Sequence, residues 1–126
     1  MAAVLSVLEF PPSTSLNSFH VTNMYSNIPV CFTIKLMCDL MISSDPTVLE
    51  FRKLINICVR YNFCGFRNRI YIFKDGLPMG GPLSASMANV FMDYLEVDVL
   101  RTAPDAQHVL GWYRFVDDIL CVWSGS

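Results

Sequence analysis

Hydrophobic side chains recur at strand-like and helix-like spacings along the chain, and each stretch predicts an element of secondary structure. Residues 19–25 begin with β-branched and aromatic side chains, which predicts a strand that the polar residues and proline of 26–29 end. Residues 30–42 are apolar on nearly every side and predict a buried helix. The Asp-Pro pair at 45–46 is typical of a helix start, and residues 47–61 then carry apolar side chains at helical spacing.

The next predicted elements are a hairpin and a loop. Residues 62–66 and 69–74 are two strand-like runs on either side of Arg67 and Asn68, which predicts a β-hairpin. Residues 77–82 contain two prolines and two glycines, so they exclude regular structure and require a loop of defined shape.

A long helix and a second hairpin complete the pattern. Residues 83–100 present one apolar stripe at helical spacing, and residues 101–107 form a polar loop. Aromatic and β-branched residues flank Asp117 and Asp118, which places both carboxylates at or beside a hairpin turn. Residues 1–17 are expected to be a leader or linker. The order of elements predicts one α+β domain with a largely antiparallel sheet.

The composition predicts that parts of the protein surface are covered and not exposed to water. The chain has 126 residues, enough for one domain with a core, and 53% of them are hydrophobic while only 16% are charged. The formal net charge of -2 argues against a free-standing nucleic-acid binder, because such proteins are usually basic.

The cysteines show no framework for disulfides or zinc. They are Cys31, Cys38, Cys58, Cys64 and Cys121. Their number is odd, no C-x-x-C pair occurs and their neighbours are mostly apolar, which predicts reduced, buried thiols in an intracellular protein with no disulfide partner. The apolar start of the chain is too short for a membrane span, so no membrane partner is expected.

The adjacent carboxylates of Asp117 and Asp118 are the first candidates for chemistry. Like charges at neighbouring positions repel, so a cation would favour the ionised state of both. A divalent metal with oxygen ligands is the natural candidate for that cation. The alternative is a solvated Asp-Asp turn without a function.

Three segments together resemble one known family. Residues 76–96, with Gly-Leu-Pro-Met-Gly and Phe-Met-Asp-Tyr-Leu-Glu, resemble motif B of reverse transcriptases. Residues 113–120, which begin Tyr-Arg-Phe-Val-Asp-Asp, resemble motif C, and residues 19–29, with Asn-Met-Tyr-Ser-Asn-Ile-Pro, resemble motif A. The order and the residues of these motifs are most similar to those of Penelope-like retroelements, and the resemblance covers about residues 18–123.

The resemblance implies a fold and an activity. Residues 18–126 would be a fragment of a reverse-transcriptase palm, an antiparallel sheet packed on helices, with the fingers and thumb largely missing. Intact relatives are RNA-directed DNA polymerases that use an RNA template, a DNA primer and deoxynucleoside triphosphates. Their nucleotidyl transfer uses two magnesium ions, with manganese as an alternative, held by carboxylates from separate strands.

The resemblance also implies roles for particular residues. Asp117 would be a principal metal ligand, with Asp118 beside it. Tyr25 falls where the family places an aromatic ring that abuts the sugar and selects against a 2′-hydroxyl; the alternative is a core aromatic residue. Met79 and Gly80 fall on the loop that packs against the incoming nucleotide and template; the alternative is a tight structural turn.

One departure from the family bears directly on activity. The family's motif A begins with an aspartate that is the third metal-binding carboxylate, and here that position is His20. Magnesium prefers oxygen ligands, so we expect magnesium-dependent polymerisation to be impaired or absent. A catalytically dead remnant or a co-opted nucleic-acid or protein interaction domain is therefore an alternative, and a metal-binding module unrelated to polymerases is another.

Overall fold

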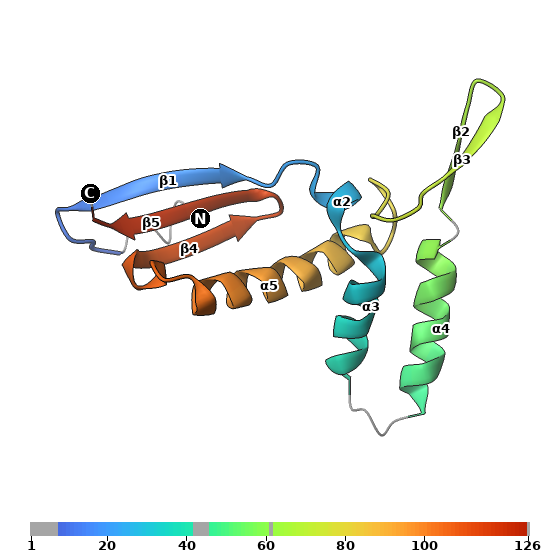
Figure 1. Ribbon diagram of the computed structural model, residues 1–126, viewed down its shortest axis with the longest axis horizontal. Helices are drawn as coiled ribbons and strands as arrows, with labels where there is room; N and C mark the ends of the chain where they lie inside the picture. Colours follow the sequence, from blue (N-terminus) through green and yellow to red (C-terminus); the bar gives the residue numbers. More distant parts are fainter. Residues whose placement is uncertain (1–7, 42–45, 61, 126) are drawn as a thin grey trace. The chain divides into compact units, whose positions relative to one another are not determined.

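The chain is described by a computed structural model at residues 8–41, 46–60 and 62–125 (Figure 1). These residues contain helices and two antiparallel sheets, one of three strands and one of two, so the predicted α+β class is confirmed. None of the helices in these ranges is long and apolar enough to cross a membrane.

The chain divides into two compact units. The first, which we call the sheet unit, comprises Met1–Thr22 and Glu96–Ser126. The second, which we call the helix–hairpin unit, is the continuous segment Asn23–Leu95. Each unit is described below by itself.

The sheet unit is built on three antiparallel strands. Their order is β1 (Thr14–His20), β5 (Asp118–Ser124) and β4 (Val109–Phe115), so β5 lies in the middle, as Figure 1 shows. β4 and β5 form the hairpin predicted around the two aspartates. Within the predicted polar loop, Ala106–His108 form a single 3-10 turn, η1, before β4.

The first strand begins earlier than the sequence pattern predicts. Thr14 pairs with Ser124 and the pairing continues to His20, so the end of the expected leader, residues 14–17, is part of β1. The predicted strand at 19–25 is therefore displaced toward the N-terminus. β1 is an edge strand with mostly exposed side chains. Backbone pairing holds it in the sheet, so its sequence does not show the alternation of apolar and polar residues from which a strand is predicted.

The two faces of this sheet differ in what they carry. Partners in the register share a face, so His20 and Asp118 lie on one face, and Ile119 and Arg114 lie on the other. On that second face Arg114 Nε donates to Glu96 Oε1 at 2.7 Å, and these two side chains are only 10% and 15% exposed. The ion pair fixes β4 against the part of the preceding helix, α5 (Ser84–Thr102), that belongs to this unit.

The core of the sheet unit is centred on β5. Ile119, Cys121 and Val122 are buried, and Phe19 of β1 stacks with Trp112 of β4 at a ring-centroid distance of 6.2 Å. Burial raises the pKa of the Cys121 thiol above its ordinary value, which keeps it protonated and unreactive.

The prediction that the thiols are buried is wrong for most of the cysteines. All five are free, but Cys31, Cys58 and Cys64 are exposed, Cys38 is half-buried and only Cys121 is in the core. Apolar neighbours in the sequence predict burial only where the whole segment is covered, and the segments that carry these cysteines are covered on one side or not at all.

The helix–hairpin unit contains most of the helical residues. Its elements are α2 (Met24–Asn27), α3 (Val30–Asp39), α4 (Thr47–Arg60), β2 (Phe63–Phe66), β3 (Arg69–Ile72) and the first part of α5 (Ser84–Thr102). The predicted positions of α4, α5 and the first hairpin agree with these bounds to within a few residues. Asp45, predicted as a helix cap, lies outside the described residues.

The chain turns directly after β1, and this ends the predicted strand at His20. Asn23 has a positive φ of 49°, and Asn27 N donates to Asn23 O at 3.2 Å, which closes the short helix α2. Asparagine tolerates the left-handed conformation better than other residues with a side chain. This local turn overrides the strand propensity of the aromatic residues around it.

Helix α3 is held from a distant loop. Its N-cap, Pro29, offers no side-chain hydrogen bond, but Asp75 Oδ1 accepts from Val30 N at 3.1 Å and from Gly76 N at 2.9 Å. Leu77 N donates to Tyr25 O at 2.7 Å. The bond from Val30 satisfies a free N–H group at the start of α3. Together the bonds fix the loop of residues 75–77 on the segment that carries α2 and α3.

The helices of this unit are buried on one side only. In α3 only Val30, Thr33 and Ile34 are buried, so the predicted burial of the whole helix is wrong. The buried residues of α5 are Ser84, Met87, Ala88 and Met92. The predicted stripe is therefore right at Met87 and wrong at its end, because residues 94–95 are exposed. Phe32 packs edge-on against Phe91, with ring centroids 6.3 Å apart.

Candidate metal centre

Three side chains converge where the strands of the sheet unit end. His20 is the last residue of β1 and pairs in the register with Asp118, the first residue of β5. Asp117 lies in the two-residue connection between β4 and β5, because Phe115 pairs directly with Asp118. The hairpin therefore places Asp117 in the turn and Asp118 beside it, as the sequence predicted.

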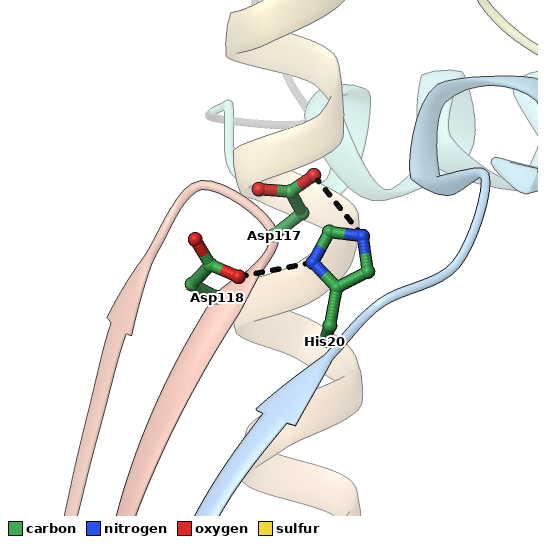
Figure 2. A group of neighbouring side chains, drawn as sticks. All are labelled: His20, Asp117 and Asp118. Atoms are coloured by element: carbon green, nitrogen blue, oxygen red, sulfur yellow. Dashed lines mark hydrogen bonds and ion pairs between the residues drawn. The ribbon is translucent and has the colours of Figure 1, made fainter.

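The ring of His20 lies between the two carboxylates, as Figure 2 shows. Its Nδ1 is 2.9 Å from Asp118 Oδ1, and its Nε2 is 3.9 Å from Asp117 Oδ2. One ligand atom from each of the three residues can be chosen so that all lie within 4.8 Å of one another. The side chains of His20, Asp117 and Asp118 are 60%, 38% and 73% exposed, so water and solutes reach all three.

The carboxylates favour the charged form of the imidazole. The hydrogen bond to Asp118 is the main cause that raises the pKa of His20, and the charges of Asp117 and Asp118 act in the same direction. Desolvation of the ring lowers the pKa; this effect is smaller than that of the hydrogen bond but larger than that of either charge alone. In its protonated form the ring is a cation held between two anions, which is the place that a metal ion would take.

Backbone contacts fix the turn that carries Asp117. Val21 N donates to Asp117 O at 2.8 Å, which ties the turn to the residue after β1. Arg114 Nη1 donates to the carbonyl of Val116 at 3.2 Å, and the same guanidinium holds Glu96. Val116 has a positive φ of 56°, an unusual and strained conformation for a β-branched residue. The surrounding contacts therefore hold the turn in a shape that its own sequence disfavours.

An open groove lies beside the three residues. It has a volume of about 670 Å³ and is lined by residues of β1, β4 and β5. Phe19 and Phe115 supply exposed apolar walls, while His20 and Asp118 supply polar groups at one end. An apolar groove with a few polar groups at one end is typical of a ligand site.

The donor set does not fit a pair of magnesium ions. Magnesium requires oxygen ligands in near-octahedral geometry, and two ions need several carboxylates that bridge or share them. Here one of the three donors is a nitrogen, and it occupies the space between the two carboxylates. One imidazole and two carboxylates form a donor set that suits a single transition-metal ion better than magnesium.

The other residues assigned by the resemblance belong to the helix–hairpin unit. Tyr25 is half-buried on α2, and its carbonyl accepts the hydrogen bond of Leu77 from the predicted loop. In that loop Met79 is among the most exposed hydrophobic residues, and Gly80 has a φ of 81° with open space where a Cβ would lie. Both alternatives for these residues stay open, because a positive φ also suits a structural turn.

The sequence pattern did not predict which residues hold the turn in place. Arg114 is a charged residue within a strand of apolar and aromatic neighbours, and that contrast is the one signal of its role. Its partner Glu96 lies 18 residues earlier, on a different element. The strained Val116 has no signal in the sequence, because valine predicts an extended strand.

Comparison with known proteins gives no identification: no family model matches the chain, and no curated protein matches it.

Proposed function

We propose that the chain is a fragment of a retroelement reverse transcriptase, with a palm-like sheet and a nucleotidyl-transfer site in which His20 impairs catalysis. The observation that carries this proposal is the register pair of His20 with Asp118. It brings the start of the segment that resembles motif A next to the turn that resembles motif C. These are the two segments whose carboxylates must meet in a two-metal polymerase.

The arrangement of the sheet unit supports the proposal. The two segments that resemble the motifs lie far apart in the sequence, and a neighbouring pair of antiparallel strands joins them at one end of the sheet. Intact relatives use such a pair to hold the metals that activate the primer 3′-hydroxyl and bind the triphosphate. In this chain Asp117 and Asp118 retain the two carboxylates of the turn.

His20 supports the view that this chain polymerises poorly. An aspartate at that position would add an anion, whereas His20 adds a nitrogen donor that is cationic when protonated. The electrostatic attraction for a divalent cation is weaker in consequence. The open groove beside the site and its apolar walls would be available to a primer terminus or a nucleotide in an active relative.

The test compares metal binding by the chain and by His20→Asp. Manganese binding is followed by the loss of the free-ion signal in electron paramagnetic resonance. We expect His20→Asp to bind manganese roughly tenfold or more tightly than the wild type, because an anion replaces a partly cationic group near the ion. Adding Asp117→Asn to His20→Asp should remove the gain. Equal affinity of the wild type and His20→Asp would refute the proposed metal site.

A primer-extension assay tests the catalytic part of the proposal. With residues 18–123 placed in an otherwise complete polymerase of the same kind, His20→Asp should restore magnesium-dependent DNA synthesis on an RNA template. Asp117→Asn in the restored enzyme should abolish it again. Equal activity with His20 and with aspartate would show that the histidine does not impair catalysis.

A second function is favoured by the contact between His20 and both carboxylates. A ring that bridges two anions stabilises the sheet end without a metal, which suits a non-catalytic interaction domain. This alternative predicts that His20→Asp destabilises the fold through repulsion among three carboxylates. It also predicts that millimolar manganese does not restore the lost stability.

A further inference from the structure

The hairpin of β2 and β3 has two chemically different faces. Directly opposed residues of an antiparallel pair share a face, and the register pairs Phe63 with Ile72 and Gly65 with Ile70. These residues form an aliphatic face with one phenylalanine. All eight residues of the two strands are exposed, so neither face packs against the described part of the chain.

The opposite face combines aromatic rings with positive charge. Phe66 pairs with Arg69, and Cys64 pairs with Tyr71. Phe73 N donates to Asn62 O at 3.1 Å, so the pairing continues by one step and the alternation places Phe73 on the side of Tyr71. We call Phe66, Arg69, Tyr71 and Phe73 the aromatic–cationic face.

The turn brings a second cation to this face. Arg67 and Asn68 both have positive φ, 49° and 61°, as the two central residues of a tight hairpin turn do. This turn brings the Arg67 guanidinium over the ring of Phe66, with Cζ 5.2 Å from the ring centroid. A guanidinium over an exposed aromatic ring is held in place while its outer N–H groups stay available to an anion.

The hairpin is also free of acidic residues. Residues 62–74 contain Arg67, Arg69 and Lys74 and no aspartate or glutamate. Among the ion pairs between described residues, none involves these three cations. The next acidic residue, Asp75, is engaged in hydrogen bonds to the backbone N–H groups of Val30 and Gly76.

We propose that the aromatic–cationic face binds single-stranded nucleic acid. Exposed rings on one face can stack successive bases, while guanidinium groups beside them contact the phosphates. A duplex hides its bases from such rings, so the face should prefer a single strand. The proposal rests on the hairpin alone and stands whether or not the sheet unit binds a metal.

The test is fluorescence anisotropy of a labelled 12-nucleotide single-stranded RNA titrated with the whole chain. We expect binding that weakens with salt, with a slope of log K against log salt of about -1.4 for the two guanidinium groups of the face. Phe66→Ala should weaken binding about tenfold or more, because one stacked base is lost. Arg69→Gln should weaken binding and reduce the slope by about 0.7.

The hairpin itself provides the matched control. Phe63 and Phe66 are the same residue type in the same strand, 67% and 60% exposed, and they lie on opposite faces. Phe63→Ala should leave the RNA affinity within twofold of the wild type. Circular dichroism of both variants verifies that they are folded to the same extent.

Several outcomes would overturn the proposal. Absence of RNA binding, tighter binding of a duplex of the same length, or equal losses in Phe63→Ala and Phe66→Ala would each do so. Concentration-dependent self-association that Phe66→Ala abolishes, seen by light scattering without RNA, would identify a second copy of the chain as the occupant instead. A DNA oligonucleotide bound as tightly as RNA supports the proposal, since the contacts involve bases and phosphates.

The same assay separates this proposal from the proposed function. His20→Asp changes the metal site and should bind RNA as the wild type does. Phe66→Ala should bind manganese as the wild type does. A failure of either proposal therefore leaves the other measurable.

Discussion

The two units of the molecule differ in charge and in the way they use their surfaces. The sheet unit contains two Lys and Arg residues against six Asp and Glu, while the helix–hairpin unit contains seven against five. The acidic unit carries the candidate metal centre, and the basic unit carries the hairpin proposed to bind phosphates. The net charge of the whole chain is the sum of the negative charge of one unit and the positive charge of the other. It therefore does not exclude a nucleic-acid contact that lies in one unit.

The units also differ in how they are held together. The sheet unit depends on pairing between strands distant in the sequence and on the buried ion pair of Arg114 with Glu96. The helix–hairpin unit depends on local elements and on hydrogen bonds that the side chain of Asp75 and the backbone of Leu77 make from the 75–77 loop. Substitutions that damage one kind of support should therefore spare the other unit.

The largest effect is expected from Arg114→Met, which breaks the support of the sheet unit. Loss of the guanidinium leaves the carboxylate of Glu96 buried without its counter-charge and should lower the free energy of unfolding by about 3 kcal/mol. Urea denaturation followed by tryptophan fluorescence measures this, since both tryptophans lie in the sheet unit. Hydrogen exchange should rise in β4 and β5 and change little in α3.

An exposed ion pair provides the control. Arg101 Nη2 lies 3.5 Å from Asp98 Oδ1, with both side chains well exposed. Arg101→Met should cost less than about 1 kcal/mol. A similar loss of stability in Arg101→Met and Arg114→Met would contradict the role given to the buried pair.

A smaller effect is expected from Gly76→Ala, which acts on the helix–hairpin unit. Gly76 has a φ of 83°, and a Cβ there would lie 2.4 Å from the carbonyl oxygen of Ser26. The clash and the strained φ together should cost about 2 kcal/mol or more and loosen α3 through the neighbouring cap of Asp75. Hydrogen exchange at Val30 and Leu77 measures the local loosening.

Gly80→Ala separates the strain from the clash. Gly80 has nearly the same φ, 81°, but a Cβ there would meet nothing within 4 Å. This variant should cost about 1 kcal/mol, the penalty of a left-handed alanine alone. If Gly80→Ala destabilises the chain as much as Gly76→Ala, the close approach of Ser26 is unimportant.

The smallest effect concerns the pH dependence of stability through His20. Because the folded state raises the pKa of His20, its contacts stabilise the fold most fully below the unfolded value of 6.5. This contribution is lost as the pH rises through the higher folded pKa. The difference in unfolding free energy between the wild type and His20→Gln should thus be larger at pH 5.5 than at pH 8.5, as measured by urea denaturation at each pH. A difference that does not change with pH would show that the imidazolium contributes nothing.

The sequence predicts elements best where local chemistry decides them. The hairpin at Arg67 and Asn68, the long helix and the turn at Asp117 follow from turn residues and side-chain spacing within short windows. β1 was misplaced because its pairing with β5 is a distant interaction that leaves no local pattern. The burial of residues 30–42 was overestimated because an apolar residue such as Leu40, which is 77% exposed, is buried only where another part of the chain packs on it.

The candidate site was predictable only in part for the same reason. The adjacent aspartates and the position of His20 can be read from the sequence through the resemblance. The orientation of the His20 ring between both carboxylates depends on the register of β1 and β5. The network of Arg114, Glu96 and Val116 joins different elements, so no spacing rule could have assembled it.

The central position of β5 has a consequence for the order of synthesis and folding. His20 and its partner Asp118 are 98 residues apart, and the loop closure that joins β1 to β5 costs entropy before these two strands pair. β1 leaves the ribosome early and stays unpaired until β5 has been synthesised. The helix–hairpin unit is continuous and can fold during this interval. We expect the carboxylates of Asp117 and Asp118 and the ring of His20 to meet only in the last step of folding.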